Sequence, residues 1–582
     1  MRHELKPQQG GARFSLPGNW LTARMLRNMP KSEVLSRSEF ARATELALSR
    51  NITREDMTDR AGQAIVDTIA KIAPADARVV ILCGPGGNGA DGFAAARHAK
   101  ARGFDVVVLS VAEPKLWKPA TAAMAKQWNG RIEHDDWAAE FDKALDGGKP
   151  SILVDALLGS GLDRAPVADF AAAIELLRQS HEMGFAVVAV DVPSGLDADG
   201  KATRTNFCVH ATHAIAYLRR RLAHVLLPGR TYCGDIIIAD VGIPESVFGD
   251  LDGDFADDQN FEPIFARMKT VDTDKWAFRL AVERLEADKS RYGRLAIVEP
   301  HHDRSSSVIL SAEAAARCGA AAITLAVQRS SIAQMATGRF SGELWSLDDR
   351  PVQSLAGQLH DTDTLFLHSA DHGTKVLTSV LETSAALVLE GQTALACLKL
   401  APEAMKSRAM SRRPSGVIIG EASGIITQAI VDVGYHSYPS TLLILNESEF
   451  SEAFGASKDI WPERLHRAAE ASRCSIILKS AVALAASPDE SVIAAAHVSR
   501  RNVYPGSGDV LRGFVAGFLT SDMPPIDAIS AAIWLHGACA ETLGHGFVAT
   551  NVLETISPAV NALKTNQLGH LPSSRPRLEY AT

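Results

Sequence analysis

Short, continuous runs of apolar and β-branched residues recur along this chain, and they constrain its fold more than any other feature. In the first half these runs cover residues 79–83, 106–109, 152–155, 187–191 and 236–240. Runs without polar alternation are typical of strands that are covered on both faces, and such strands belong to parallel sheets. Ala-rich stretches of helical character separate the runs. The sequence therefore predicts an α/β fold.

A second series of apolar runs lies in the other half of the chain, at residues 295–298, 322–325, 364–367, 387–389, 442–445 and 475–478. The chain has 582 residues, which is too long for one ordinary domain. The two series show no residue-level repeat of each other, which favours a fusion over a duplication. We expect a Rossmann-like, three-layer, parallel-sheet domain followed by a second α/β domain.

The charge balance and the cysteines exclude several classes of protein. Lys plus Arg number 60 and Asp plus Glu number 68, so a net charge of −8 gives no support for a nucleic-acid or anionic-membrane partner. No apolar run approaches the ~18–20 residues that span a bilayer. The seven cysteines are scattered, without CxxC spacing, which argues against a disulfide framework or a zinc site and suits the cytoplasm. Residues 1–30 are basic and lack a signal-peptide core, so we expect a flexible extension.

Three loops rich in glycine and aspartate follow strands of the first half, at residues 83–92, 155–164 and 191–197. Ligands of open parallel sheets bind beyond the carboxyl ends of the strands, although an aspartate there can equally be a helix N-cap. Glycines let a backbone approach a phosphate, although a glycine-rich loop can also be a tight turn that binds nothing. Taken together, the loops favour a site, because their oxygens suit a hard cation or a polyhydroxyl ligand. These oxygens belong to Asn88, Asp91, Asp155, Asp191 and Ser194.

These three segments resemble the NAD(P)H-hydrate epimerase family, the YjeF N-terminal domain. The family patterns GPGNNGGDG, DALxGTGL and DxPSGLDxxxG correspond to residues 84–92, 155–162 and 191–200, and the resemblance covers about residues 31–246. It implies interconversion of the R and S epimers of NADHX and NADPHX, the reduced nicotinamide nucleotides hydrated at ring carbon 6. It also implies a potassium ion held by Asn88, Asp155 and Ser194.

The same resemblance implies a catalytic and substrate-binding role for Asp191. An acid there makes chemical sense, because the ring nitrogen can expel a protonated 6-hydroxyl and water can return to the other face. The substrate-binding loops that it implies comprise Gly87, Asn88, Gly89, Ala90, Asp91, Gly159, Ser160, Gly161, Leu162, Asp163, Arg164 and Ala165.

Three positions depart from the family pattern. Gly87 and Ala90 replace an Asn and a Gly of the first motif, and the family lysine falls within residues 219–221, where we take Arg221 as its equivalent. Arginine keeps the charge but does not readily donate its proton, which puts an acid role in doubt. The arginines could instead bind phosphates, and the alternative is that they form a solvent-exposed basic face.

The decisive segment of the second half is Pro505-Gly506-Ser507-Gly508-Asp509, which opens a helix expected from residue 510 to 519. Such a turn makes an anion hole of backbone N–H groups, and its aspartate can act as a base toward a hydroxyl that attacks a phosphoryl group. The alternative is a capped helix start with an acid in its first turn.

This segment resembles the GSGDVL motif of the ribokinase-like, ADP/ATP-dependent NAD(P)H-hydrate dehydratases. Residues 289–294, 478–480 and 531–537 resemble three other motifs of the same enzymes. The resemblance implies ADP or ATP with Mg²⁺, held by Lys479, Gly506, Ser507 and Gly508. It implies Asp509 as the catalytic base and as a substrate contact, and Asn446 at the position of a substrate-side histidine.

The departures are heavier in this half. The family's glycine-rich GGS and GPGLG segments are replaced at residues 299–301 and 368–372, and its DADAL motif is replaced at residues 390–395. Histidines 301, 302, 368 and 372 lack the spacing of a metal-ligand set. The main hypothesis is a bifunctional repair enzyme. The alternatives are an epimerase fused to a catalytically dead scaffold or nucleotide-sensing domain, or to a small-molecule kinase. We expect a homo-oligomer with an epimerase domain at 31–246, a linker at 247–288, a dehydratase domain at 289–566 and a tail at 567–582.

Overall fold

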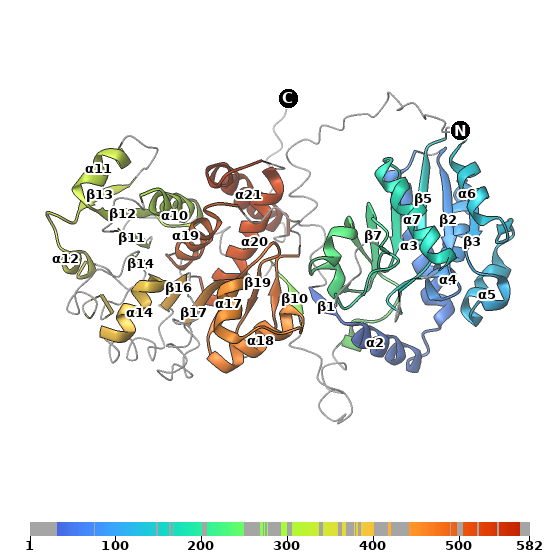
Figure 1. Ribbon diagram of the computed structural model, residues 1–582, viewed down its shortest axis with the longest axis horizontal. Coiled ribbons are helices and arrows are strands. Elements are labelled where there is room, and N and C mark those ends of the chain that lie inside the picture. Colours follow the sequence, from blue (N-terminus) through green and yellow to red (C-terminus); the bar gives the residue numbers. More distant parts are fainter. Residues whose placement is uncertain are drawn as a thin grey trace, which may run out of the picture.

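The computed structural model describes residues 32–74, 76–146, 149–161, 165–166, 168–200, 207–248, 268–271, 273, 276–277, 293–299, 305–336, 342–358, 364–367, 378, 380–381, 386–400, 417–420, 441–488, 490–496, 504–520, 523–543 and 546–570. Within these residues, two sheets dominate the protein, one in each half of the chain (Figure 1). No helix in the described ranges is long and apolar enough to cross a membrane.

The first sheet has seven strands in the order β4-β3-β2-β5-β6-β7-β9, and all of them run parallel. The strands are β2 (Arg78–Cys83), β3 (Asp105–Ser110), β4 (Ile132–Glu133), β5 (Ser151–Ala156), β6 (Ala186–Val190), β7 (His213–Tyr217) and β9 (Asp235–Ala239). The chain builds outward from β2 in one direction and then from β5 in the other. The loops after β2 and β5 therefore diverge, and the crevice between them is where such sheets bind ligands.

Helices cover both faces of this sheet. Side chains of Val79 and Ile81 pack toward α2 (Arg37–Ser49), α3 (Arg54–Ile72), α4 (Gly87–Ala101) and α5 (Pro119–Gln127). Their neighbours Val80 and Leu82 pack toward α6 (Trp137–Leu145) and α7 (Asp169–Glu182). Successive strand residues point to opposite faces, so both faces must be apolar, as the continuous runs predicted.

The second sheet has thirteen strands in the order β13-β12-β11-β14-β15-β16-β17-β18-β19-β20-β10-β1-β8. Its strands from the second half of the chain are β10 (Met268–Thr270), β11 (Arg294–Glu299), β12 (Ala322–Val327), β13 (Glu343–Ser346), β14 (Thr364–Leu367), β15 (Ala386–Glu390), β16 (Val417–Gly420), β17 (Thr441–Asn446), β18 (Ser475–Lys479), β19 (Leu484–Ala486) and β20 (Ile493–Ala494). The pairings from β13 to β18 are parallel, and those of β19 with β18 and β20 are antiparallel.

This second sheet is also sandwiched by helices. One layer contains α10 (Ser305–Cys318), α19 (Ser507–Thr520), α20 (Pro525–Leu543) and α21 (Ala549–His570). The other contains α17 (Glu447–Phe454) and α18 (Trp461–Ser472). Further helices in the described residues of this half are α11 (Arg329–Ala336), α12 (Val352–Ala356) and α14 (Gly391–Leu400). The predicted fold class, two α/β domains with parallel sheets, is confirmed, and every strand named in the sequence analysis is present.

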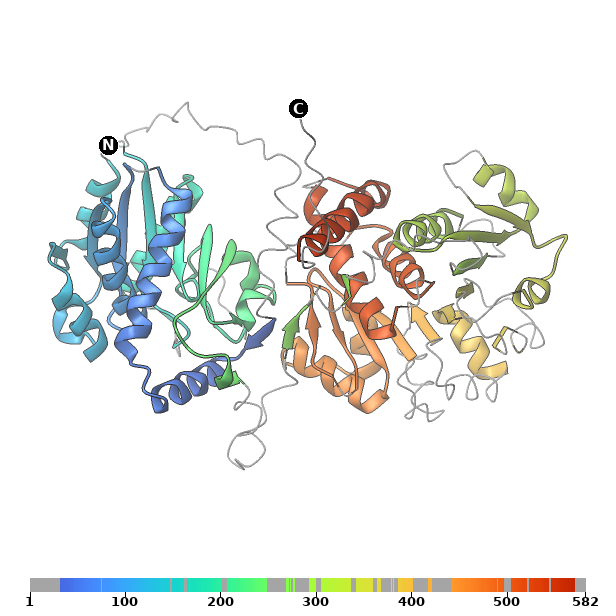
Figure 2. The ribbon, with the colours of Figure 1, turned by 180° about the vertical axis from the view of Figure 1, so that it is seen from behind.

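Strands from the first half continue the second sheet. Strand β1 (Glu33–Leu35) pairs antiparallel with β10 and parallel with β8 (Arg220–Arg221). Figures 1 and 2 show β1 and β10 side by side where the two halves meet. Part of the expected linker at 247–288 therefore belongs to the fold, since β10 lies in the sheet and buried Trp276 stacks edge-on against Trp534, with ring centroids 6.0 Å apart.

Candidate active site

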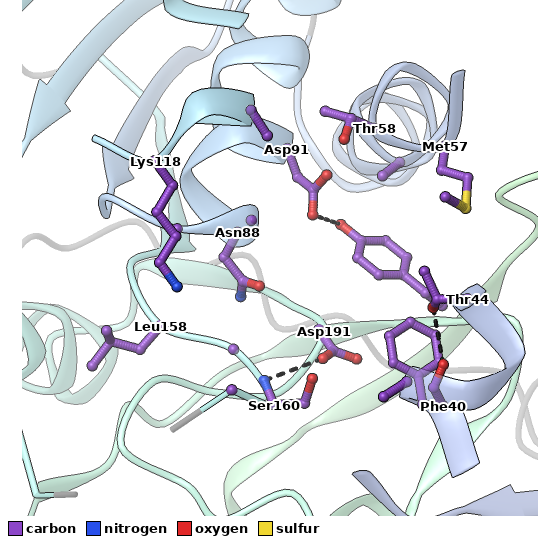
Figure 3. A pocket seen from close by; sticks show the side chains of 18 of the residues that line it. Phe40, Thr44, Met57, Thr58, Asn88, Asp91, Lys118, Leu158, Ser160 and Asp191 are labelled. Atoms are coloured by element: carbon purple, nitrogen blue, oxygen red, sulfur yellow. Dashed lines mark hydrogen bonds between the residues drawn. The ribbon is translucent and has the colours of Figure 1, made fainter. Parts of the chain in front are cut away.

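A cavity of about 920 Å³ opens at the carboxyl ends of β2, β5 and β6 (Figure 3). Its walls come from α2, α3, the start of α4 and the segments that follow β5 and β6. Helix α4 begins at Gly87, so residues 87–92, which the sequence analysis expected to be part of a loop, are helical. The Gly87–Asp91 segment is therefore the first turn of a helix, whose free N–H groups point toward this end of the sheet.

Asp191 lies at the end of β6, and its carboxylate enters the cavity (Figure 3). Its backbone is left-handed, with φ of +61°, a conformation that costs free energy for any residue other than glycine and is common at functional sites. Its Oδ2 accepts a hydrogen bond from Ser160 N at 3.3 Å, and its Oδ1 lies 3.1 Å from the guanidinium of Arg221. The side chain therefore faces the cavity and does not cap a helix.

Arg221 is held rigidly behind Asp191. Its guanidinium lies 3.5 Å from the ring centroid of Phe40, and its side chain is fully buried. His224 Nδ1 accepts the Arg221 backbone N–H at 2.9 Å, so His224 Nε2 carries the hydrogen that it donates to the Asp191 carbonyl at 2.8 Å. Burial lowers the pKa of His224 to about 3, which keeps this imidazole neutral. All of residues 219–221 are buried, so a solvated basic face is wrong.

Asp91 contributes a second carboxyl group to the cavity from the first turns of α4. Its Oδ2 accepts a hydrogen bond from the Tyr217 hydroxyl at 3.0 Å. Burial raises the pKa of Asp91 well above its usual value, the charge of Asp191 adds to this, and hydrogen bonds from Tyr217 and Thr58 oppose it. Two acids in one cavity thus have different surroundings.

The three residues expected to hold potassium lie around the backbone of residues 158–159. Asp155 is fully buried and accepts bonds from Ser194 Oγ at 2.5 Å and from Ser194 N at 2.7 Å. The Ser194 hydroxyl also contacts the Leu158 carbonyl, at 3.0 Å. Asn88 Nδ2 donates to the Val190 carbonyl, and a Cβ on Gly159 would lie 2.1 Å from Asn88 Oδ1. Burial raises the pKa of Asp155 to about 6.

In the second half, Ser507, Gly508 and Asp509 form the first turn of α19, which begins earlier than the expected residue 510. Gly506 precedes it with φ of +82°. Asp509 Oδ1 accepts hydrogen bonds from Ser307 Oγ on α10 and from Arg512. Lys479 and Asn446 end adjacent strands and pair in register.

Two further contacts bear on this second group of residues. His536 has its pKa lowered to about 4, chiefly by burial and also by the charge of Lys479, and it interacts with the Ser507 backbone. Asn446 is the N-cap of α17, since its Oδ1 accepts from Glu449 N at 2.9 Å, so the fold alone explains an asparagine there.

The structure thus brings the predicted residues of the first half together, and in the second half it pairs Asn446 with Lys479 and places Ser507, Gly508 and Asp509 in one helical turn. Leu162, Asp163, Arg164 and the histidines 301, 302, 368 and 372 lie outside the described residues. Sequence reasoning missed Tyr217, Phe40 and His224. The signal for Tyr217 was present, because residues 213–217 (HAIAY) form another apolar run before three arginines. Phe40 and His224 carry no local signal, since only the tertiary fold places them beside Arg221.

Comparisons with known proteins find relatives of both halves. Residues 54–221 match the family described as YjeF-related protein N-terminus, and residues 369–559 match the family described as NAD(P)H-hydrate dehydratase. The chain is 26% identical over 536 residues to the bifunctional NAD(P)H-hydrate repair enzyme Nnr of Escherichia coli, covering 89% of this chain and 91% of that protein. It is 32% identical over 231 residues to the NAD(P)H-hydrate epimerase of Roseobacter litoralis, covering 36% of this chain and 99% of that one.

Among solved structures, the chain is similar to the ADP/ATP-dependent NAD(P)H-hydrate dehydratase from Bacillus subtilis, co-crystallised with ATP and Mg²⁺. The identity is 18% and the TM-score 0.36, with 49% of this chain and 97% of that chain covered.

Proposed function

We infer that this chain, which belongs to the family of bifunctional NAD(P)H-hydrate repair enzymes, catalyses two successive reactions. As an isomerase it interconverts the R and S epimers of NADHX and NADPHX. As a lyase it dehydrates the S epimer to NADH or NADPH with ADP or ATP and Mg²⁺. The alternatives of a dead second domain or a small-molecule kinase are not favoured, because residues 369–559 match the dehydratase family. Homo-oligomers and a cytoplasmic location stay predictions.

The observation that carries the epimerase assignment is the buried Asp191–Arg221 pair in the cavity. The hydrated ring releases its 6-hydroxyl once that oxygen is protonated, and the ring nitrogen lone pair forms a planar iminium. Water then attacks ring carbon 6 from the other face and loses a proton to a carboxylate. Asp191 is positioned to exchange this proton. Arg221 does not readily give up a proton, so its part is to orient and charge-balance Asp191.

A potassium ion fits the residues expected to hold it. Asp155 is a fully buried carboxylate without an ion pair in the described part of the chain, and Ser194 Oγ and the Leu158 carbonyl lie within hydrogen-bond distance of each other beside it. With the Asn88 side chain they offer one anionic and several neutral oxygens, a set that suits a hard cation. The ion would supply charge that compensates Asp155. It would thereby fix the loop that carries Ser160, the hydrogen-bond donor to Asp191.

For the dehydratase we propose Asp509 as the base that takes the proton of the 6-hydroxyl as this oxygen attacks a phosphoryl group. The N–H groups of Gly506, Ser507 and Gly508, at the start of α19, would bind the phosphates, with Lys479 nearby. The epimerase domain would span residues 31–246 and the dehydratase domain 289–566. Strands β1 and β10 join the two across one sheet.

The test of the epimerase is Asp191→Asn in the full-length chain, with the rate of R-to-S conversion followed by chiral chromatography. General acid–base catalysis contributes about 10²–10⁴-fold, and we expect a loss of that order with the melting temperature kept. Asp240→Asn is the matched control, because Asp240 also directly follows a strand but is exposed and accepts the Gly242 N–H. A wild-type rate in Asp191→Asn would refute the assignment.

A further inference from the structure

We propose that Asp91 is a second catalytic carboxyl group, which exchanges a proton with the 6-hydroxyl on the face of the nicotinamide ring opposite Asp191. Tyr217 is its positioning residue. This inference rests on the proposed epimerase function and deepens it, because it assigns the second proton that epimerisation must move.

The placement of the two carboxyl groups carries the proposal. Asp91 enters the cavity from α4 and Asp191 from the end of β6, and Figure 3 shows them approaching it from different sides. Epimerisation needs a proton on the departing oxygen at one face and a proton acceptor for incoming water at the other. A single group on one face cannot serve both. The cavity therefore needs a second proton carrier, and Arg221 is unsuited to the task.

The two carboxyl groups have different partners. Asp191 lies against the guanidinium of Arg221, whose nitrogen is 3.1 Å from its Oδ1. Asp91 is 8% exposed and forms no ion pair within the described part of the chain. Burial without a cation favours the neutral acid, in agreement with the raised pKa of Asp91. Two carboxyl groups with such different surroundings in one cavity are typical of an acid and base pair.

Tyr217 determines which oxygen of Asp91 holds the proton. Its hydroxyl donates to Oδ2 of Asp91, so the acidic proton is left to Oδ1. Tyr217 itself is a poor proton donor, because burial and the charges of Asp91 and Asp191 raise its pKa well above 10.0. A phenolate between two carboxylates would be strongly disfavoured. The tyrosine therefore stays neutral and orients the acid.

The reaction balances with one proton shared by the pair. Asp91 gives its proton to the 6-hydroxyl oxygen, the C6–O bond breaks, and the nitrogen lone pair forms the N1=C6 bond of the iminium. Water on the opposite face then forms a new C6–O bond, its proton goes to Asp191, and the N1=C6 electrons return to nitrogen. The product epimer leaves a proton on Asp191, which serves the reverse reaction or exchanges with solvent. Both directions thus use the singly protonated pair.

Other titratable groups share the cavity with Asp91 and set the electrostatic field around it. They are Arg37 and Glu45 from α2, Arg54 from α3, Lys118, Asp191 and Tyr217, with Arg221 behind Asp191. Because the active pair must hold one proton, the epimerisation rate falls at high pH once Asp91 has lost it.

The test compares kcat/KM for epimerisation against pH in the full-length wild type, Asp91→Asn and Tyr217→Phe. We expect Asp91→Asn to lose about 10²–10⁴-fold in rate, with its melting temperature kept. Tyr217→Phe removes a hydrogen bond that lowers the pKa of Asp91. The alkaline limb of the kcat/KM–pH profile of this variant should therefore move to higher pH. Tyr232→Phe is the matched control, because Tyr232 is equally buried in the same half but packs on His210, away from the cavity, and its limb should stay in place.

A second readout needs no turnover. The infrared carbonyl band of a protonated carboxylic acid in the ligand-free wild type near neutral pH should be missing in Asp91→Asn. Full activity of Asp91→Asn, an unmoved alkaline limb in Tyr217→Phe, or no lost carbonyl band would each overturn the inference while leaving Asp191 and the proposed function standing. A wild type that does not epimerise the hydrate would overturn both.

Discussion

Replacing Asp155 by asparagine should stabilise the protein without potassium and abolish its response to potassium. Burial raises the pKa of this carboxyl group from 3.8 to about 6. Near pH 7 the group is ionised in the folded and the unfolded protein, so a shift of this size costs about 3 kcal/mol of folding stability. Asparagine removes that cost. It can still accept the Ser194 N–H and can donate to Ser194 Oγ, so the loop geometry is kept.

The sign of the pH dependence follows from the raised pKa. The folded protein binds the proton more tightly, so the stability contributed by Asp155 is complete below pH 3.8 and is lost as the pH rises through about 6. The gain from Asp155→Asn should therefore be near zero around pH 4 and reach about 3 kcal/mol near pH 7. A bound cation would offset the same cost in the wild type.

The assay is urea unfolding in potassium chloride and in choline chloride at equal ionic strength, with the transition of the N-terminal half followed separately. Potassium should stabilise the wild type and leave Asp155→Asn unchanged. Asp191→Asn is the control, because it removes a carboxylate from the same cavity but not from the cation set, so it should keep the potassium response. Equal stabilisation of the wild type and Asp155→Asn by potassium would refute the reasoning.

Three further substitutions test other parts of the account. The pKa of His224 falls from 6.5 to about 3 on folding, so the stability that this residue contributes is complete above pH 6.5 and decreases toward pH 3. The decrease should amount to about 1.4 kcal/mol at pH 5.5. The substitution His224→Gln should flatten this dependence of the unfolding free energy on acid pH, as measured in unfolding titrations. Gly159→Ala places a Cβ 2.1 Å from Asn88 Oδ1 and should lower epimerase activity at least tenfold, whereas Gly87→Ala, which meets no atom within 4 Å, should cost much less in the same assay. Asp509→Asn should abolish nucleotide-dependent dehydration and leave the epimerisation rate intact; loss of both would contradict separate sites.

Much of the fold was predictable because parallel strands covered on both faces must be continuously apolar. The three loops after β2, β5 and β6 were predictable for the same reason, since parallel strands present their carboxyl ends at one edge. The start of α4 at Gly87 was not, because three glycines in six residues suggest a loop. The buried Gly89 and Gly92 are there for close packing, as a Cβ on Gly89 would lie 1.8 Å from the Gly84 carbonyl oxygen.

The joining of the halves could not be predicted either. Strand β1 has three residues and β8 has two, too few for a pattern to register. Their place in the second sheet depends on pairing with β10, which is more than two hundred residues away from β1. Arg221 illustrates the consequence. The sequence shows three adjacent arginines, and only the fold assigns Arg219 to Glu33 and Glu245 and Arg221 to Asp191.

The central claim is that one chain carries both repair reactions, and the most direct measurement starts from the R epimer alone. Purified full-length protein is given R-NADHX, Mg²⁺ and ADP or ATP, and the return of reduced-nicotinamide absorbance is compared with that in Asp191→Asn and in a nucleotide-free sample. We predict full recovery that requires nucleotide and slows to the spontaneous epimerisation rate in Asp191→Asn. Absence of recovery from the R epimer, or recovery equally fast in Asp191→Asn, would contradict the account.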